Sequence, residues 1–405
     1  MNIKIAARSV FRNKRRTTIT LLSIVFGCVA IIVFGGFVDY SMWGLRESTI
    51  HSRLGHLQVY KEGFSEKGGT NPLAYSIEDY PKIKSIIEAQ DHVDFVTSRL
   101  DFSGLIGGDE NSVICVGKGV EPEKEKELGV TVSMVEGEEL SSEAMDEGIV
   151  GKGLAGGLGV KVGDYLTILT STAEGALNAI DFKLRGIFRT GVKEYDDVAV
   201  MVPMELAKTL LYTEDVQSIV VVLDETENTD LVADNLRREF SQANLDLEIK
   251  TWSDLATFYH QVVQLYQGIF WVVKLIILII VIFSIANTMT MSVFERIREI
   301  GTIRAMGTKR RGVLSLFLME GLILGVLGGT LGVVFGIATA KLLSIKGIYI
   351  PPPPTMTEGY TTLINIVPQD LIFVFCLAVG TSLISSIYPA FKAARLKVVD
   401  ALRYI

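Results

Sequence analysis

The sequence contains few cysteines and shows no pattern of a disulfide framework or of a metal site. Only three of its 405 residues are cysteines. Cys28 and Cys376 fall in apolar stretches, and Cys115 is the single cysteine of residues 41–268. A disulfide within that region is excluded, so its fold must be stabilised by its own core. The four histidines lack the spacing of metal ligands, and structural or surface roles suit them better.

Motifs that bind nucleotides or support catalysis are also missing. The Gly-Lys pairs at 117–118 and 151–152 lack the glycine spacing and the following Ser or Thr of a Walker A loop. There is no nucleophile elbow and no pair of catalytic carboxylates, and Asp196 and Asp197 are most simply explained as a solvated turn. We therefore predict a chain that is not an enzyme and that binds no cofactor or metal itself.

Long apolar stretches, in contrast, are prominent. Four of them reach or exceed the ~20 residues that a helix needs to cross a ~30 Å hydrocarbon core. As buried helices of a soluble protein they would need amphipathic neighbours to cover them, and the sequence offers none. We therefore predict transmembrane helices at 17–40, 269–291, 312–342 and 369–390.

The charges divide the chain into two regions of opposite sign. Residues 41–268 carry 39 of the 46 acidic and 20 of the 39 basic groups, a net charge of −19, whereas the remainder carries +12. Basic residues concentrate in the head, in the loop 295–311 and in the tail 391–405. Because Lys and Arg favour the cytoplasmic side, we expect both termini and that loop in the cytoplasm. Residues 41–268 and the loop 343–368 would then lie outside the cell membrane.

The basic head has the pattern of an amphipathic helix. Within residues 1–16, Ile3, Ala6 and Val10 share one helical face, and Arg8 and Arg12 lie opposite. Such a helix suits the inner surface of an anionic membrane. A disordered basic tail is the alternative.

The acidic region has the alternation of an α+β domain. Its outer parts, 41–120 and 216–252, follow a β-α-β-β and then a β-α-β order, close to a ferredoxin-like split unit. Between them, 121–215 would be an inserted subdomain, and 253–268 a stalk helix that continues into the second span. The predicted fold is an α-helical membrane protein with four transmembrane helices plus a large α+β extracytoplasmic domain inserted between the first and the second.

Two features of the third apolar stretch indicate helix packing. Its glycines form two sets with a spacing of four residues, which lets helix backbones approach closely in lipid: Gly321, Gly325 and Gly329, and Gly332 and Gly336. Glu320 is an intramembrane polar residue, so it should face protein and be paired or protonated.

The loop 292–311 contains residues that membrane topology does not require. In ERIREIGTIRAMGTKRR (295–311), Ile297 and Ile300 continue a narrow apolar stripe from Val293, while Gly301 and Gly307 allow bends. Pairs at i, i+3 are available between Glu295 and Arg298 and between Arg296 and Glu299. Positive-inside topology alone would account for the last three basic residues. The mixed charge of the earlier part favours a helix that docks on a cytoplasmic protein.

These segments resemble those of a known family. ERIREIGTIRAMGTKRR with FLMEGLILGVLGGTLG, the head RSVFRNKRRTTITLLSI and the tail YPAFKAARLKVVDALRY are similar to the FtsX/MacB-type (type VII) ABC transporter permeases. Within the acidic region, GIVGKGLAGGLGVKVGDYLTIL and LRGIFRTGVKEYDDVAVMVP look more like the lipoprotein-releasing (Lol) permeases of that superfamily. The resemblance covers essentially the whole chain.

The resemblance implies a permease subunit of the bacterial inner membrane that pairs with an identical or homologous permease and with two copies of a separate ATPase, which binds ATP and Mg. The loop 292–311 would be the coupling helix, and closure of the ATPase would move the periplasmic domain. The residues expected at the ATPase contact are Glu295, Arg296, Arg298, Glu299, Ile300, Arg304 and Met306.

Three functions remain open under this resemblance. The first is extraction of lipoproteins or a related lipidated cargo, with a periplasmic lipoprotein chaperone as a further partner. The second is efflux of an antibiotic, peptide or toxin with a membrane-fusion protein. The third is a signalling permease that regulates a periplasmic hydrolase without transporting. A region of 228 residues outside the membrane favours the first two.

Overall fold

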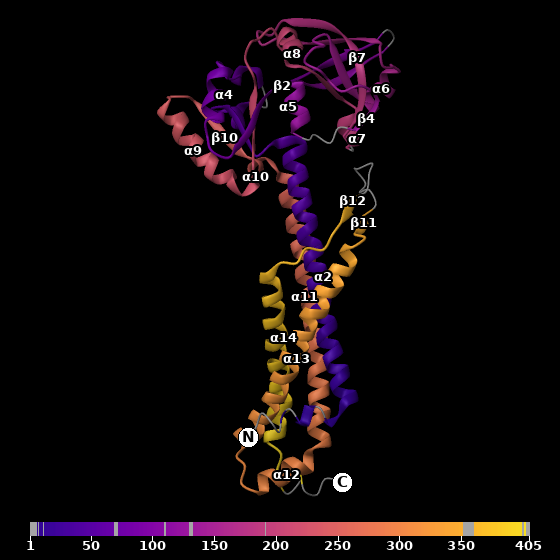
Figure 1. Cartoon of the computed structure of the whole chain (residues 1–405), viewed down its shortest axis with the longest axis vertical. Coiled ribbons are helices and arrows are strands. Elements are labelled where there is room, and N and C mark those ends of the chain that lie inside the picture. Colours follow the sequence, from indigo (N-terminus) through magenta and orange to yellow (C-terminus); the bar gives the residue numbers. More distant parts are fainter. Residues whose placement is uncertain are drawn as a thin grey trace. The chain divides into compact units, whose positions relative to one another are not determined.

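The chain forms two compact units (Figure 1). The computed structural model describes residues 6, 8–10, 12–68, 72–108, 111–128, 133–190, 192–350, 360–398 and 401. One unit, here called the helical unit, comprises Met1–Trp43, Gln261–Ile350 and Thr361–Ile405. The other, the α+β unit, comprises Gly44–His260 and Pro351–Tyr360.

Within the described residues, four helices are long and apolar enough to cross a membrane. They are α2 (Lys14–Thr49), α11 (Thr257–Glu295), α13 (Arg310–Ser344) and α14 (Pro368–Ala394). At ~1.5 Å per residue, the 36 residues of α2 and the 39 of α11 exceed the ~30 Å of a hydrocarbon core by a wide margin. The short helix α12 (Ile297–Ala305) joins α11 to α13, and β11 (Ile348–Ile350) pairs with β12 (Tyr360–Thr362).

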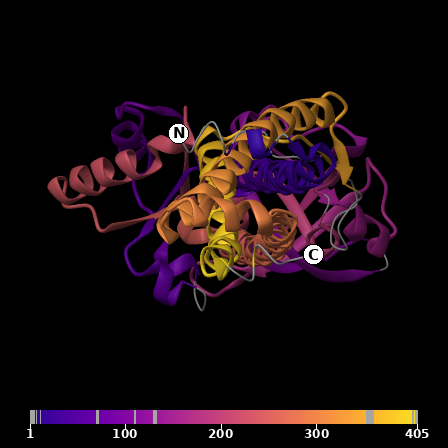
Figure 2. The same ribbon diagram turned by 90° about the horizontal axis from the view of Figure 1, so that it is seen from below.

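The helical unit is held by small and apolar side chains between its helices. One cluster joins Ile24 of α2, Ile285 of α11, Phe317 of α13 and Ala378 of α14. α13 and α14 run side by side, as the end-on view in Figure 2 also shows. Val10, from the predicted amphipathic head, belongs to the same cluster, while Arg8 and Arg12 are exposed. This part of the apolar face therefore packs on protein rather than on lipid. Residues 1–5, 7 and 11 of that predicted helix lie outside the described residues.

The α+β unit contains a ferredoxin-like arrangement of four strands. In chain order the elements are β1 (Leu57–Lys61), α4 (Tyr80–Glu88), β2 (Val93–Gly107), β9 (Ser218–Leu223), α9 (Thr229–Gln242) and β10 (Leu247–Thr251). The strands lie in the order β10-β1-β9-β2 with antiparallel pairing throughout. This is the spatial order of a split β-α-β unit.

The insertion between β2 and β9 does not build a separate sheet. Its strands are β3 (Ser112–Val120), β4 (Ser133–Gly137), β5 (Glu147–Gly151), β6 (Tyr165–Ser171), β7 (Leu177–Arg189) and β8 (Ala199–Pro203). Pairing runs β2-β3-β8-β5-β7, and β6 pairs with both β7 and β2, so these strands close into a ring. Closure satisfies strand edges that would otherwise be unpaired.

The length of β2 explains why the predicted subdomain 121–215 is continuous with the rest. β2 has 15 residues; Val93–Arg99 pair with β9, and Arg99–Gly107 pair with β3. A single strand therefore serves both the ferredoxin-like part and the ring.

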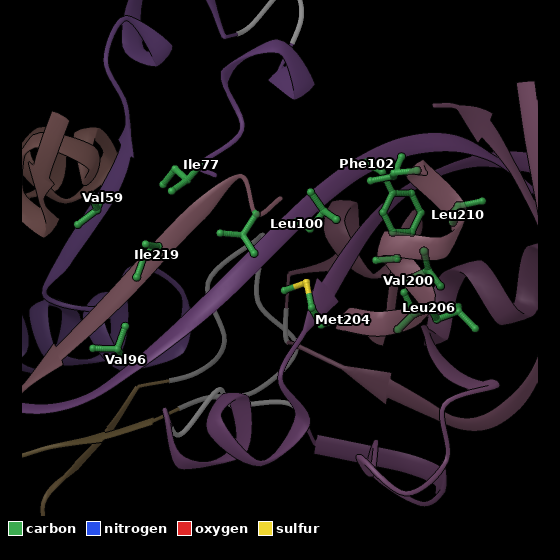
Figure 3. Close-up of a cluster of buried hydrophobic side chains, with 14 of the residues drawn as sticks. Val59, Ile77, Val96, Leu100, Phe102, Val200, Met204, Leu206, Leu210 and Ile219 are labelled. Atoms are coloured by element: carbon green, nitrogen blue, oxygen red, sulfur yellow. The ribbon is translucent and has the colours of Figure 1, made fainter. Parts of the chain in front are cut away.

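The core of the α+β unit is likewise continuous. Figure 3 shows side chains of the ferredoxin-like part beside those of the ring, with Leu100 of β2 between them. Helix α8 (Met204–Leu211) contributes Leu206 and Leu210 to the ring side. The remaining helices are short: α3 (Phe64–Lys67), α5 (Pro122–Glu127), α6 (Lys152–Leu158), α7 (Lys193–Asp196) and α10 (Trp252–Leu255), with the π-helix η1 (Ile50–Leu54) and the 3-10 helices η2 (Pro72–Tyr75) and η3 (Thr226–Asn228).

Two further expectations from the sequence differ from the structure. The stalk is not one helix from residue 253: a capping box of Thr251 and Asp254 begins the short helix α10, and Ala256 leaves the helical conformation (φ −84°, ψ 55°) before α11 begins. Asp196 is also not solvated. It is 4 % exposed and accepts hydrogen bonds from the backbone N–H and the hydroxyl of Thr190, which fix the end of β7.

Candidate functional site between α11 and α13

The charged segment 292–311, predicted as one coupling helix, forms a corner in which only α12 (Ile297–Ala305) is a separate helix. α11 ends at Glu295, Arg296 leaves the helical conformation (φ −115°, ψ 15°), and α12 begins at the next residue. Gly307 then adopts a positive φ of 96°, a conformation that glycine takes without a steric cost, and α13 begins at Arg310. Gly301, in contrast, is buried within α12 and makes no bend.

The apolar stripe of this segment faces the interior of the helical unit. Val293, Ile297 and Ile300 are 3–4 % exposed, so their side chains pack inside. The opposite face carries the charged groups. A narrow buried stripe with a polar face is the pattern of a helix lying on the surface of a unit.

Arg296 links the corner to α13. Its Nε donates to Glu299 Oε2 at 2.9 Å, and one terminal nitrogen donates to Glu320 Oε1 at 2.6 Å. Its guanidinium also lies 5.6 Å from the centre of the Phe317 ring. The side chains of Arg296 and Glu320 are 7 % and 4 % exposed. Removing one partner of a buried pair typically costs ~3–5 kcal/mol, because the other charge is left unpaired.

The two other carboxylates of the corner pair with the N-terminal segment. Arg16 contacts Glu295 at 2.9 Å, and Arg12 contacts Glu299 at 2.7 Å. Asn13 also donates to Glu295 at 3.4 Å, and Arg16 to the Ser292 hydroxyl at 3.1 Å. These pairs are more exposed than Arg296–Glu320, and exposed pairs contribute only ~0.2–1 kcal/mol each.

The electrostatics of Glu299 favour its charged form. Partial burial raises the pKa of this carboxyl, but hydrogen bonds from Arg12 and Arg296 outweigh burial and hold the pKa below its usual value. Glu299 is therefore an anion at neutral pH and can bind both arginines.

The other predicted contact residues differ in their exposure. Arg298 and Met306 are exposed on α12 and at its end, and Met306 is 74 % exposed. Arg304 donates to the backbone carbonyl of Leu396, which follows α14. Arg296 and Ile300 are buried and support the corner from inside, so in this conformation they offer no surface to a partner.

The predicted packing glycines of α13 face two different helices. A Cβ at Gly321 or Gly325 would meet the backbone or side chains of α14 at 3.2 Å or less, and one at Gly329 would meet Phe375 at 3.1 Å. A Cβ at Gly332 or Gly336 would lie 2.5–2.6 Å from Cys28 or Ile32 of α2. α13 thus has close helix neighbours on two sides.

Sequence reasoning did not find Arg12, Arg16 and Phe317 as parts of this site. Both arginines were assigned to membrane topology, and Arg12 also to the polar face of a helix on the membrane surface. The sequence feature that could have indicated the two arginines is the pair of carboxylates at 295 and 299, because the positive-inside rule does not require acidic residues in this loop. Within the described ranges, no group of three or more His, Cys, Asp or Glu side chains could hold a metal ion.

Comparison with known families matches both units. Residues 17–239 match the model of the MacB-like periplasmic core domain, which covers more than half of the chain. Residues 271–398 match the FtsX-like permease C-terminal model, which includes α12 and α13.

Individual relatives match at low identity over most of the chain. The lipoprotein-releasing system transmembrane protein LolE of Haemophilus influenzae is 22 % identical, with 96 % of each chain covered. YvrN of Bacillus subtilis, an uncharacterized ABC transporter permease, is 25 % identical over 100 % of this chain and 99 % of its own. The lipoprotein-releasing system transmembrane protein LolC of Neisseria meningitidis is 24 % identical over 63 % of this chain and 64 % of its own.

Proposed function

Because the chain belongs to the FtsX/MacB-type ABC transporter permeases, we propose that it passes the ATP-driven movement of a separate ATPase to its α+β unit. Its relatives include a lipoprotein-releasing system transmembrane protein and an ABC transporter permease, and the described part of this chain has four helices long and apolar enough to cross a membrane. Hydrolysis, with ATP and Mg, belongs to the partner, and the chain itself needs no cofactor. This division suits a sequence without a Walker A loop.

The observation that carries the proposal is the corner at α12. It is a short helix with a buried apolar stripe and an exposed face that includes Arg298 and Met306. Arg296 ties it to Glu320 of α13 through a buried ion pair. A helix fixed in this way can receive force at its surface and pass it to a transmembrane helix.

Two long helices provide the route toward the α+β unit. α2 continues without a break into Gly44–Thr49, and α11 begins at Thr257, so each belongs in part to both units. A continuous helix transmits displacement that a flexible linker would absorb. The basic head, corner and tail favour the cytoplasmic side of the inner membrane for α12 and the termini, which leaves the α+β unit in the periplasm.

Lipoprotein release is the proposed task. The names of the LolE and LolC relatives support it. In this scheme two permeases, identical or homologous, and two ATPase copies extract lipoproteins or a related lipidated cargo, with a periplasmic chaperone as acceptor. Efflux with a membrane-fusion protein is the second candidate, which the MacB-like match of the α+β unit favours.

Photo-crosslinking tests the docking surface. A crosslinking amino acid at the exposed Met306 should capture the cognate ATPase, whereas one at Ile300, 3 % exposed, should not. Tyr349, 65 % exposed in β11, serves as a second control at the other end of α13. Capture at Tyr349 but not at Met306 would contradict the proposal.

Mass spectrometry of the co-purified complex tests the cargo. Diacylated or triacylated proteins bound to the permease and its ATPase would support lipoprotein release. A membrane-fusion protein without lipidated cargo would support efflux instead.

A further inference from the structure

The joint between α11 and α12 is a single residue wide. Arg296 alone separates the last residue of α11 from the first residue of α12, and it is not helical. One non-helical residue can absorb a change of φ and ψ, so the angle between the two helices is set by side-chain contacts with neighbouring elements. Two sets of contacts hold this joint: an inside contact, which is buried, and an outside contact, which is exposed to solvent.

The inside contact is built on Arg296 and joins α12 to α13. Arg296 contacts Glu299 of α12 and Glu320 of α13, and its pair with Glu320 is buried. A buried ion pair is costly to separate because each charge would remain without a partner. α12 and the start of α13 therefore move as one body.

The outside contact comes from the N-terminal segment, here Arg12 and the start of α2 with Arg16. It holds both sides of the joint. Arg16 pairs with Glu295, the last residue of α11, and Arg12 pairs with Glu299 in the first turn of α12. The exposed fractions are 18 % and 39 % in the first pair and 57 % and 45 % in the second. Pairs of this exposure part and re-form at little cost, and salt weakens them.

We infer that Arg12 and Arg16 are positioning residues that clamp the α11–α12 joint and set how far movement at α12 reaches α2. The inference rests on the proposed function, in which α12 receives the force. The arginines need not touch the ATPase. They act through Glu295 and Glu299. The buried Arg296–Glu320 pair keeps α12 fixed to α13, so the exposed pairs determine the angle between α11 and α12.

This inference explains features that membrane topology leaves aside. Positive-inside topology requires arginines in the head, but it does not require carboxylates opposite them. It also does not require the additional donors to this corner, Asn13 to Glu295 and Arg16 to Ser292.

The test uses the Arg16–Glu295 pair in the full-length chain in lipid nanodiscs. The variants are Arg16→Glu, Glu295→Arg and the double exchange of both charges. Arg8→Glu is the matched control, because Arg8 is an exposed arginine of the same segment that makes no ion pair with any described residue. Hydrogen exchange of the backbone amides 297–306 is measured first, without ATPase.

Arg16→Glu should speed this exchange about two- to fivefold, the range expected for a lost pair of this exposure. The double exchange should return it to the wild-type rate, and Arg8→Glu should leave it unchanged. With the cognate ATPase added, Arg16→Glu should bind the ATPase as the wild type does but lower the transport obtained per ATP hydrolysed. The double exchange should restore that ratio.

The outcomes separate the clamp from the proposed function. Unchanged exchange in Arg16→Glu, or no recovery in the double exchange, overturns the clamp even if the ATPase binds. Faster exchange with an unaltered transport ratio overturns its role in transmission. If the wild-type chain binds no ATPase, the proposed function fails, while the exchange rates still decide whether Arg16 positions α12.

Discussion

Arg296 stands between α11 and α12 and carries one charge that serves two carboxylates. The planar guanidinium presents several donors at fixed angles, which lets it contact Glu299 and Glu320 together. An ammonium group is a point charge on a flexible stem and does not reproduce this geometry. The identity of this residue, and not only its charge, should matter to the corner.

Arg296→Lys should therefore destabilise the helical unit although the charge is kept. We expect a loss of ~1–3 kcal/mol, since one buried hydrogen bond to a carboxylate is lost. Glu320→Gln should cost more, ~3–5 kcal/mol, because Arg296 then remains buried with one partner fewer. Thermal unfolding in nanodiscs measures both, and a larger loss for Arg296→Lys than for Glu320→Gln would contradict this ranking.

His56 gives the α+β unit a dependence on pH. It is 1 % exposed, its Nδ1 accepts the Leu223 N–H at 3.0 Å, and its Nε2 lies 3.1 Å from the Thr226 hydroxyl. Burial, followed by the proximity of His51, lowers the pKa of His56 to about 4. An unfolded histidine titrates near ~6.5, so the unfolded chain takes up a proton first.

The contribution of neutral His56 to the free energy of unfolding should therefore be fully present above pH ~6.5 and be lost as the pH falls toward ~4. Thermal unfolding of the chain at pH 7.5 and pH 5 measures the effect, with a melting temperature lower by several degrees at pH 5. His56→Gln should flatten the difference. An equal dependence on pH in this variant would show that other groups cause it.

At the scale of single elements, α13 is the helix on which the helical unit is assembled. Its glycines face α14 on one side and α2 on the other. Because apolar association provides little drive within lipid, close backbone packing has to supply the contact. A methyl group added at one of these glycines should therefore push the neighbouring helices apart.

Gly332→Ala should separate α13 from α2. A Cβ at 332 would lie 2.5 Å from the Cys28 Cβ, so one helix must shift, at a cost of ~1–3 kcal/mol. Gly380→Ala in α14 is the matched control, because no atom lies within 4 Å of a Cβ there. Thermal unfolding should distinguish the two. Equal melting temperatures for the two variants would argue against close packing at Gly332.

The periodic and compositional signals of the sequence predicted most elements but not their long-range pairing. The apolar stretches and the β-α-β order were sufficient for the spans and for the ferredoxin-like part. The closure of the ring was not predictable, because β6 pairs with residues of β2 that lie 60 to 64 positions earlier in the chain. The break at Ala256 was also missed, because the apolar residues keep their helical spacing across it.

The sequence predicted which segment forms the candidate site, but not the ion pairs and hydrogen bonds that its side chains make. The mixed charges marked 295–311, and the position of Glu320 in an apolar stretch required a partner. The identity of that partner depends on the bend at Arg296, which turns its side chain toward α13. The burial of Arg296 and Ile300 follows from the same bend, and no local pattern showed it.

At the scale of the whole molecule, the proposal joins a docking helix at α12 to the α+β unit through continuous helices. In this proposal a separate ATPase is the partner of the permease, and the buried Arg296–Glu320 pair connects α12 rigidly to α13. The docking surface is the part of this scheme that a single measurement can address. It consists of exposed groups, so changing them should leave the fold intact.

The most direct measurement is the ATP hydrolysis of the cognate ATPase in nanodiscs with the wild-type chain and with Arg298→Glu/Met306→Glu. The proposal predicts that the wild type binds and stimulates the ATPase. The double variant should lose at least about tenfold in affinity, as removal of a contact worth ~1.4 kcal/mol would give, and retain its melting temperature. Wild-type binding and stimulation in the double variant would contradict the account.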